Sequence, residues 1–544
     1  MASRLQDERL GPTFGAMQIG TSLAVFLTGS ATVQTWNYYR TYPEDSVYLK
    51  MLVAVVYALD TTHTMLVAYA CYTYSILDFG DYAPLEHIIL PSSASFILDG
   101  LVTFVVHTYY CFRVYHITQS RALMGSCWAM ALVRLALSVL ISATLISLGR
   151  WDTMWKDSMR SYVALMQCVG AAVDVLIAVC ICSSLVRQRS GFKSSNTLID
   201  RIVAFTLGSG LLTAVVAVAE TITYLTMRNY IFMAFYTITA KLFTNSFLAS
   251  LNERAYLRRD LENWCLDWTG LSISIRYFRN YPEDRLALRA LVAIVLCIDM
   301  FHSAVLIRAV HQYTVEFFGD DQAAATLVWS LKMAAMMLGI NISVVQMFFC
   351  LRVYLITRSL VLAVITTTLA LARFVIHIRQ MVTMFSATTL AVVTTSTFRW
   401  EVTSLLTVGA ASDVLVAASI CWALLRMRSD FASSDKLVDK LVAFTIGSGL
   451  MTSVVAVLEY LAIDGFAFAL FFSILGKVFS VSLLASLNER KDSRRQLAAG
   501  RGPGSGKSSS NHVTIEMRRT HFTTHEDGSP RMFLAEGDDK LPTV

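Results

Sequence analysis

Long apolar stretches separated by short polar segments run through the whole chain. In the first half we predict seven of them, each near the length of about 20 residues that an α-helix needs to cross a hydrocarbon core. Because a lipid-exposed backbone must satisfy its own hydrogen bonds, each stretch is predicted to be a transmembrane helix. The seven predicted spans are residues 13–36, 47–74, 88–114, 122–148, 161–186, 202–226 and 230–251.

The second half contains six further stretches of the same kind. We therefore expect an all-α polytopic membrane protein of about 13 transmembrane helices, arranged as two parallel repeats of seven and six helices. The composition agrees, because 55% of residues are hydrophobic and only 15% are charged, against about 25% in soluble domains. The mean hydropathy is +0.54. The six predicted spans are residues 286–310, 323–351, 360–384, 402–425, 441–463 and 466–487.

The two halves are copies of one module. The motif YPED at Tyr42–Asp45 returns at Tyr281–Asp284, a shift of 239 residues, and FGD returns with the same shift. After a three-residue deletion, the run ASLNER at Ala249–Arg254 matches ASLNER at Ala485–Arg490. A repeat of this length indicates a duplicated domain, because solenoid repeats are only about 20 to 50 residues long.

The second copy is predicted to lack the first span. Shifting that span by 239 residues leads to residues 252–277, which hold too many charges to stay in lipid. After seven crossings the chain is on the side of the membrane opposite its start. Because the second copy then lacks its first span, the equivalent spans of both copies cross the membrane in the same direction. The predicted division is an extracytoplasmic amino terminus (1–12), a seven-helix repeat (13–254), a polar cytoplasmic connector (255–285), a six-helix repeat (286–490) and a disordered cytoplasmic tail (491–544).

The distribution of Lys and Arg predicts the orientation of the chain. These residues gather in the segments between spans one and two, three and four, and five and six, and after span seven. Under the positive-inside rule this places the amino terminus outside and the carboxyl terminus in the cytoplasm. The first span has no convincing cleavage site, so we interpret it as a signal anchor that remains in an integral membrane protein.

Other recognisable chemistry is sparse. The ten cysteines show no C-x-x-C or His-rich zinc spacing, and the tail segment GRGPGSGKSSS lacks the glycine that a phosphate-binding loop requires before Gly506. Lys241 has no carboxylate one turn before it, which argues against a retinal Schiff base. We expect no enzyme activity, no catalytic residue, no cofactor, no metal and no nucleic-acid partner. The expected partners are the lipid bilayer, a small-molecule ligand and a cytoplasmic signalling protein.

Ionisable residues deep in the spans form the candidate site. A charge at mid-membrane costs about 2.5–3.5 kcal/mol on insertion scales, so such residues normally face the bundle interior and pair with one another. Most of them recur in the second copy, although Asp99 is replaced by Leu338. The candidate set is Asp60, His63, Asp99, Arg134, Asp174, Glu220, Lys241, Asp299, His302, Arg373, Asp413, Glu459 and Lys477.

The D-x-x-H motif of Asp60 and His63 permits two interpretations. Residues three apart share a helix face, so the two side chains could handle a proton together. Alternatively, the imidazole only donates a hydrogen bond to another helix. Lys241 is expected to form a buried ion pair with Asp174 or Glu220, with a role in fixing helix register or in function.

An ordered set of motifs gives the chain a resemblance to a known family. The set consists of YPED, D-x-x-H, the segments YCFRVY and FCLRVY after span three, an R-x-R-S-x-F-x-S-S loop, and SLNER after span seven. Over residues 13–490 the chain resembles a large family of mushroom multi-spanning membrane proteins that carry a domain of unknown function. The resemblance implies a membrane location and a helical fold but no activity. The chain departs from the usual single unit by being a tandem duplication.

Two classes of function follow from this sequence. Seven helices, an outside amino terminus and basic cytoplasmic segments favour a receptor-like sensor. Parallel repeats and mid-membrane charges favour a small-solute or proton-coupled transporter, although no span is broken by paired Gly and Pro, the best sequence sign of a transport site. We favour the sensor.

Overall fold

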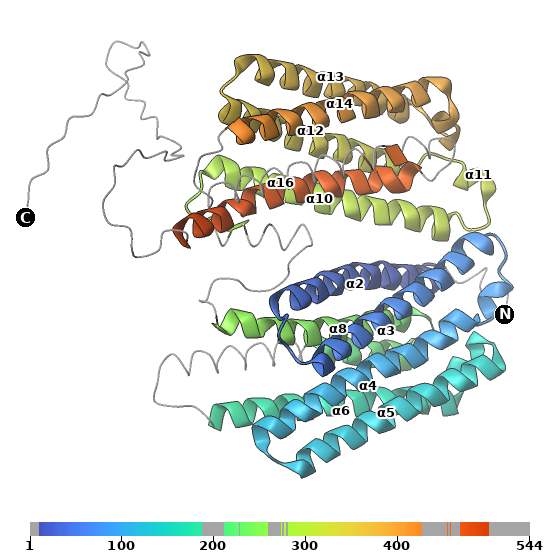
Figure 1. Ribbon diagram of the computed structural model, residues 1–544. Coiled ribbons are helices and arrows are strands. Elements are labelled where there is room, and N and C mark those ends of the chain that lie inside the picture. Colours follow the sequence, from blue (N-terminus) through green and yellow to red (C-terminus); the bar gives the residue numbers. More distant parts are fainter. Residues whose placement is uncertain are drawn as a thin grey trace, which may run out of the picture. The chain divides into compact units, whose positions relative to one another are not determined.

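The computed structural model describes residues 10–187, 212–227, 229–258, 281–426 and 468–499, together with residues 274, 277, 278, 454, 457 and 458. Helices make up almost all of this part (Figure 1). Between the helices of the described part, only isolated β-bridges occur, joining His87 to Arg150 and, at the equivalent positions of the second repeat, Thr326 to Thr389. The expectation of an all-α fold is confirmed.

The first repeat begins with a π-helical turn that continues directly into a long helix. A second π-helical turn extends the next long helix, and short 3-10 helices lie between later ones. The elements are η1 (Gly11–Gly15), α2 (Ala16–Thr41), α3 (Val47–Tyr72), η2 (Thr73–Leu77), η3 (Pro84–Glu86), α4 (Leu90–Thr118), α5 (Arg121–Leu148), η4 (Trp151–Trp155), α6 (Asp157–Arg187) and α8 (Ile231–Arg258).

The second repeat reproduces this order from its second span onward. Its elements are α10 (Leu286–His311), η5 (Gln312–Glu316), α11 (Asp321–Ala324), α12 (Trp329–Thr357), α13 (Leu360–Ser386), η6 (Leu390–Thr394), α14 (Ser396–Arg426) and α16 (Phe468–Ala499). The predicted span 323–351 needs correction at its start, because α11 is a separate short helix and α12 begins at Trp329.

Ten described helices are long and apolar enough to cross a membrane, and shorter apolar helices cover Leu212–Thr226 and Ser473–Asn488. They correspond to the predicted spans, which confirms a polytopic membrane protein. The predicted span 441–463 lies almost wholly outside the described residues. Most of 252–277, where a span is predicted to be missing, and nearly all of the predicted tail 491–544 beyond α16 lie outside them too.

Equivalent residues start and stop the helices in both repeats. Ser120 and Ser359 cap the amino-terminal ends of α5 and α13, where each hydroxyl accepts a backbone N–H two positions into the helix. The preceding helices end at Gln119 and Arg358, whose φ angles of 54° and 55° are left-handed. The duplication has therefore kept the sharp turn between spans three and four.

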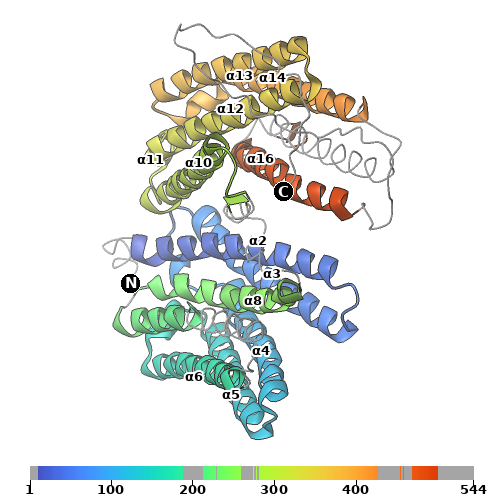
Figure 2. The same ribbon diagram turned by 90° about the vertical axis from the view of Figure 1, so that its left-hand side faces the viewer.

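Within each repeat the helices pack in a consistent order. In the first, α2 packs on α8, α3 on α4, and α5 between α4 and α6. In the second, α10 packs on α12, α12 on α13, and α13 on α14. Figure 2 shows α4, α5 and α6 gathered on one side of the first repeat and α2, α3 and α8 on the other. The candidate site lies where these two groups of helices meet.

The repeats touch through equivalent loops that follow their second spans. Both repeats lie within one unit, Met1–Leu497. Gly80 and Gly319 have left-handed φ angles of 83° and 78°, and a Cβ atom on Gly80 would lie 3.2 Å from the Cα atom of Gly319. The rings of Phe79 and Phe318 are 5.3 Å apart. These contacts join equivalent loops of the two repeats.

Candidate functional site

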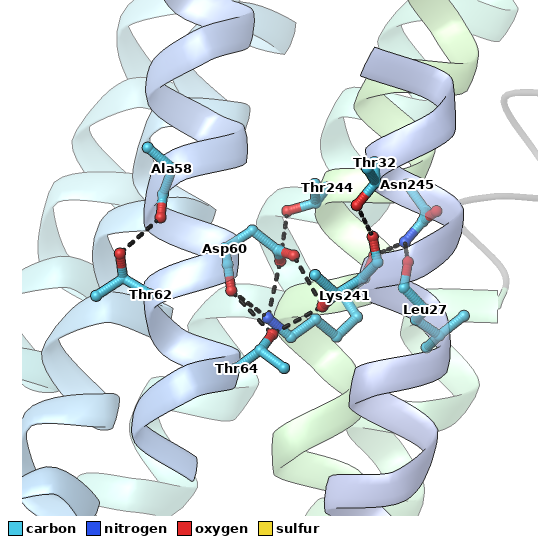
Figure 3. Close-up of polar contacts among 10 residues, drawn as sticks. Leu27, Thr32, Ala58, Asp60, Thr62, Thr64, Lys241, Thr244 and Asn245 are labelled. Carbon is cyan, nitrogen blue, oxygen red and sulfur yellow. Dashed lines mark hydrogen bonds and ion pairs between the residues drawn. The ribbon is translucent and has the colours of Figure 1, made fainter. Parts of the chain in front are cut away.

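A fully buried ion pair joins α3 to α8 in the first repeat. Lys241 Nζ lies 3.1 Å from Asp60 Oδ1, and both side chains have no exposed surface. The same Nζ donates a hydrogen bond of 2.6 Å to the Asp60 carbonyl oxygen, while Thr244 Oγ1 donates to Asp60 Oδ1 at 2.9 Å. From α2, Thr28 Oγ1 lies 3.3 Å from Asp60 Oδ2. Figure 3 shows Asp60 and Lys241 pointing toward one another between their helices.

The second repeat contains the same pair with similar supporting contacts. Lys477 Nζ lies 2.9 Å from Asp299 Oδ1 and donates to the Asp299 carbonyl oxygen at 2.8 Å. Ser303 and Ser480, at the positions equivalent to Thr64 and Thr244, hydrogen-bond to Lys477 Nζ at 2.7 Å and to Asp299 Oδ1 at 3.4 Å. This pair is a feature of the module, because both copies build it from equivalent atoms.

The predicted partners of Lys241 were wrong. Asp174 instead pairs with His107 on α4, whose Nε2 lies 2.9 Å from Asp174 Oδ1. Glu220 accepts hydrogen bonds from Gln167 and, at 3.2 Å, from Thr239. Lys241 therefore locks α8 to α3, whereas the two acids interact with α4, α6 and α8.

A second buried pair, between α4 and α5, is looser. Arg134 Nη2 lies 3.7 Å from Asp99 Oδ2, and the two residues are 4% and 2% exposed. Neither Asp99 Oδ1 nor Arg134 Nε and Nη1 makes a hydrogen bond to any residue that the structure describes. The arginine passes so close to Gly170 on α6 that a Cβ atom there would lie 2.8 Å from its Nε atom.

The second repeat keeps this arginine but changes its surroundings. Arg373 lies against Gly409 in the same way and over the ring of Phe479 at 5.2 Å, but Leu338 takes the place of Asp99. His377, equivalent to Ser138, lies against Gly339. Asp413 accepts a hydrogen bond of 3.4 Å from Gln346. The other candidate acid of this repeat, Glu459, lies outside the described residues.

His63 and His302 do not pair with the aspartates of their motifs. Both histidines are buried, yet the lysines hold Asp60 and Asp299. Within the described residues, neither ring nitrogen of His63 nor Nε2 of His302 makes a hydrogen bond. The ring of His63 instead lies with its edge toward Tyr236 at 6.1 Å. Neither sequence interpretation of D-x-x-H describes this geometry.

One end of the first repeat contains a hollow of about 430 Å³, measured with its opening. We call it the hollow; its lining is almost wholly apolar. The hydroxyls of Thr13 and Tyr74 are used within the protein, because they donate to the carbonyl oxygens of Leu10 and His87 at 2.9 and 2.8 Å. The lining residues are Leu10, Thr13, Phe14, Met17, Tyr74, Leu85, Trp151, Tyr230 and Met233.

Packed aromatic residues connect the hollow to the buried charges. Met233, Tyr236 and Phe96 belong to one core cluster with Trp151. The rings of Phe96 and Tyr236 stack at 4.5 Å between α4 and α8. Phe96 is about one helical turn before Asp99, and Tyr236 lies about one turn after Met233 and about 1.4 turns before Lys241. The hollow and the charges are therefore linked through two helices.

The sequence motifs tie helices together at the opposite end of each bundle. Tyr42 of YPED donates a hydrogen bond of 3.0 Å to the carbonyl oxygen of Asn252 in ASLNER, and Arg113 of YCFRVY donates to Ser250 at 2.7 Å. Each bond recurs in the second repeat, from Tyr281 to Asn488 and from Arg352 to Ser486. These motifs therefore stabilise the fold.

The sequence predictions missed His107 and Gln167, although both are buried within predicted spans. The counterpart of His107 is Gln346, which bonds Asp413 as His107 bonds Asp174, whereas the counterpart of Gln167 is the apolar Leu406. A polar residue in an apolar span was the available signal. Among the described residues, no group of three His, Cys, Asp or Glu side chains could hold a metal ion.

Comparison with known proteins agrees with the duplication. The model of a family of unknown function (DUF6534) matches residues 170–256 and 409–492. The chain is similar to this family twice. The two matches begin 239 residues apart and end 236 residues apart, which agrees with the three-residue deletion in the second copy. Neither a curated protein nor a solved structure matches the chain.

Proposed function

We propose that this multi-pass membrane protein is a receptor-like sensor that binds a small molecule at the hollow of the first repeat. The observation that carries the proposal is the position of α8. This helix provides Met233 to the wall of the hollow, next to Tyr230 just before its start, and, about two turns further on, the buried Lys241. One rigid element thus joins an external opening to a buried charge network.

The packing provides a route for the signal. A ligand in the hollow would contact Met233 and, through the stacked rings of Tyr236 and Phe96, displace α8 relative to α4. Packed interiors respond to such displacement by changing between discrete arrangements. The loose pair of Asp99 and Arg134, with its unbonded atoms, is the part of the network best able to rearrange.

The proposed orientation follows from the chain's charges. We place the hollow end outside together with the amino terminus, and the ends tied by YPED and ASLNER in the cytoplasm, where Lys and Arg are concentrated. A cytoplasmic signalling partner would then meet the ends of α2, α4 and α8. This protein would be a tandem member of the mushroom family that the motifs resemble, and it would have no enzymatic activity.

Side-specific thiol labelling tests the proposal. Met233→Cys reports access to the hollow, and Thr237→Cys and Ser473→Cys report access one turn from Lys241 and Lys477, all in a background without the native cysteines. We expect an impermeant maleimide to modify Met233→Cys from the outside only. Thr237 is buried, and its hydroxyl faces Gly20 of α2, so Thr237→Cys should react slowly.

The transporter remains the second candidate, because the lysine and aspartate pairs recur in both parallel repeats. Labelling of Thr237→Cys from both faces would mean alternating access and would replace the sensor by the transporter. If none of the three cysteines reacts from either face, the charges are structural and both proposals are wrong.

A further inference from the structure

We infer that the hollow takes one uncharged, largely apolar molecule per chain, and that the second repeat takes none. This inference rests on the proposed sensor function and specifies the chemistry of its ligand. It depends on three features of the structure: the lining of the hollow, the charge balance of the interior behind it, and the residues that replace the lining in the second repeat.

The lining selects an apolar body. Phe14, Met17, Trp151 and Met233 present carbon and sulfur surface to the space. Tyr74 cannot recognise a polar ligand without losing a bond, because its oxygen donates to the His87 carbonyl and accepts the Ile89 N–H at 3.2 Å. The space of about 430 Å³ includes open solvent at the mouth of the hollow, so the enclosed part is much smaller and admits only a compact group. A small molecule is therefore expected.

The interior excludes a charged ligand. Asp60 with Lys241 and Asp99 with Arg134 are two pairs of opposite charge, and each charge already faces its partner. A further cation or anion in the hollow would be buried without a counter-ion, at a large cost in free energy. A neutral molecule meets no such penalty.

In its sequence, the second repeat does not keep most of the residues that line the hollow. Leu10, Phe14 and Met17 come from the first span and the residue before it, the span for which the second repeat has no predicted counterpart. The positions of Trp151, Met233 and Leu85 hold Leu390, Ala469 and Ala324. All three side chains have thus become smaller, and the wall formed by the first span has no predicted equivalent in the sequence.

Protection of a cysteine in the hollow tests the inference. The full chain with Met233→Cys, in lipid vesicles, is treated with maleimide in the presence of 1-octanol, octanoate or octylammonium at equal membrane concentration. These probes share one apolar body and differ in charge. We expect 1-octanol to slow modification about tenfold, while the two ions change the rate by less than about twofold. At Ser473→Cys, all three probes should leave the rate unchanged.

A matched pair of substitutions provides the control. Leu85→Trp, added to Met233→Cys, should fill the hollow and remove the protection by 1-octanol, whereas Ala324→Trp at the equivalent position should preserve it. If Leu85→Trp does not fold, Met17→Phe provides a smaller filling. Loss of protection with Ala324→Trp as well would overturn the assignment to the first repeat.

The remaining outcomes separate the inference from the proposed function. Two outcomes refute the uncharged ligand but leave the sensor proposal intact. In one, octanoate or octylammonium protects Met233→Cys as well as 1-octanol does. In the other, Met233→Cys reacts but no probe protects it. The rate of maleimide modification could instead depend on the acyl-chain length of the vesicle lipid and not on the probes. That result would identify a lipid chain as the occupant of the hollow and would also refute the inference. A cysteine that never reacts from outside refutes both proposals.

Discussion

The two repeats hold the same ion pair in different surroundings. In the first, the side chains of Lys241 and Asp60 have no exposed surface, whereas those of Lys477 and Asp299 are 35% and 16% exposed. The first repeat has α2, whose Thr28 covers Asp60, and the second has no predicted counterpart of that helix. In both copies the pair joins the second span to the last one, α3 to α8 and α10 to α16.

The second pair shows the opposite behaviour. Arg134 has Asp99 beside it, whereas Arg373 has Leu338 at that position, even though both arginines lie across an equivalent glycine. The framework around the arginine is common to the module, and the acid belongs to the first repeat alone. This difference locates the specialised part of the molecule behind the hollow, where the sensing function is proposed.

The largest effect that tests this comparison is expected from Lys241→Met. The substitution leaves Asp60 buried without its counter-ion, which costs about 3–5 kcal/mol when one partner of a buried pair is removed. Lys477→Met should cost clearly less, because Asp299 is less completely buried than Asp60. Thermal unfolding in detergent measures both. Equal losses of stability would show that the greater exposure of the second pair does not lower its energetic contribution. As a control, Asp60→Asn combined with Lys241→Met should restore part of the stability that Lys241→Met alone removes.

A smaller effect is expected from Asp99→Leu, which gives the first repeat the residue of the second. It leaves the Arg134 guanidinium without its acid, at a cost of about 1–3 kcal/mol for an unsatisfied buried polar group. If Asp99 takes part in sensing, we expect 1-octanol to change the reactivity of Thr237→Cys in the parent and the Asp99→Leu variant to lose this change. A variant that loses stability but keeps this response would assign Asp99 a purely structural role.

Sequence reasoning predicted the helices of this fold well, because an apolar run of membrane-spanning length allows few alternatives. It also found Asp60 and Lys241, since the duplication repeats both. It assigned Lys241 the wrong partner because hydropathy gives the depth of a residue but not the direction in which its helix faces. His107 was missed because its residue type changes between the repeats, although its counterpart Gln346 makes the equivalent contact to Asp413.

The hollow could not be predicted at all. Its lining comes from the starts or ends of separate elements, η1, η2, η3, η4 and α8 among them, and no spacing in the sequence brings these together. The π-helical turns that extend α3 and precede α2 also have no sequence signature of their own. The hollow is determined by tertiary packing, which the sequence pattern does not specify.

The smallest effect is expected where the repeats are alike. Tyr42→Phe and Tyr281→Phe each remove one hydrogen bond, to the carbonyl oxygens of Asn252 and Asn488. Each should lower stability by about 0.5–1.5 kcal/mol, as a single hydrogen bond usually does. Because the two bonds are 3.0 and 3.1 Å long, the losses should be equal within error in thermal unfolding. A clear difference would mean that the repeats have diverged at the YPED end as well, and the specialised region would then extend beyond the surroundings of Asp99.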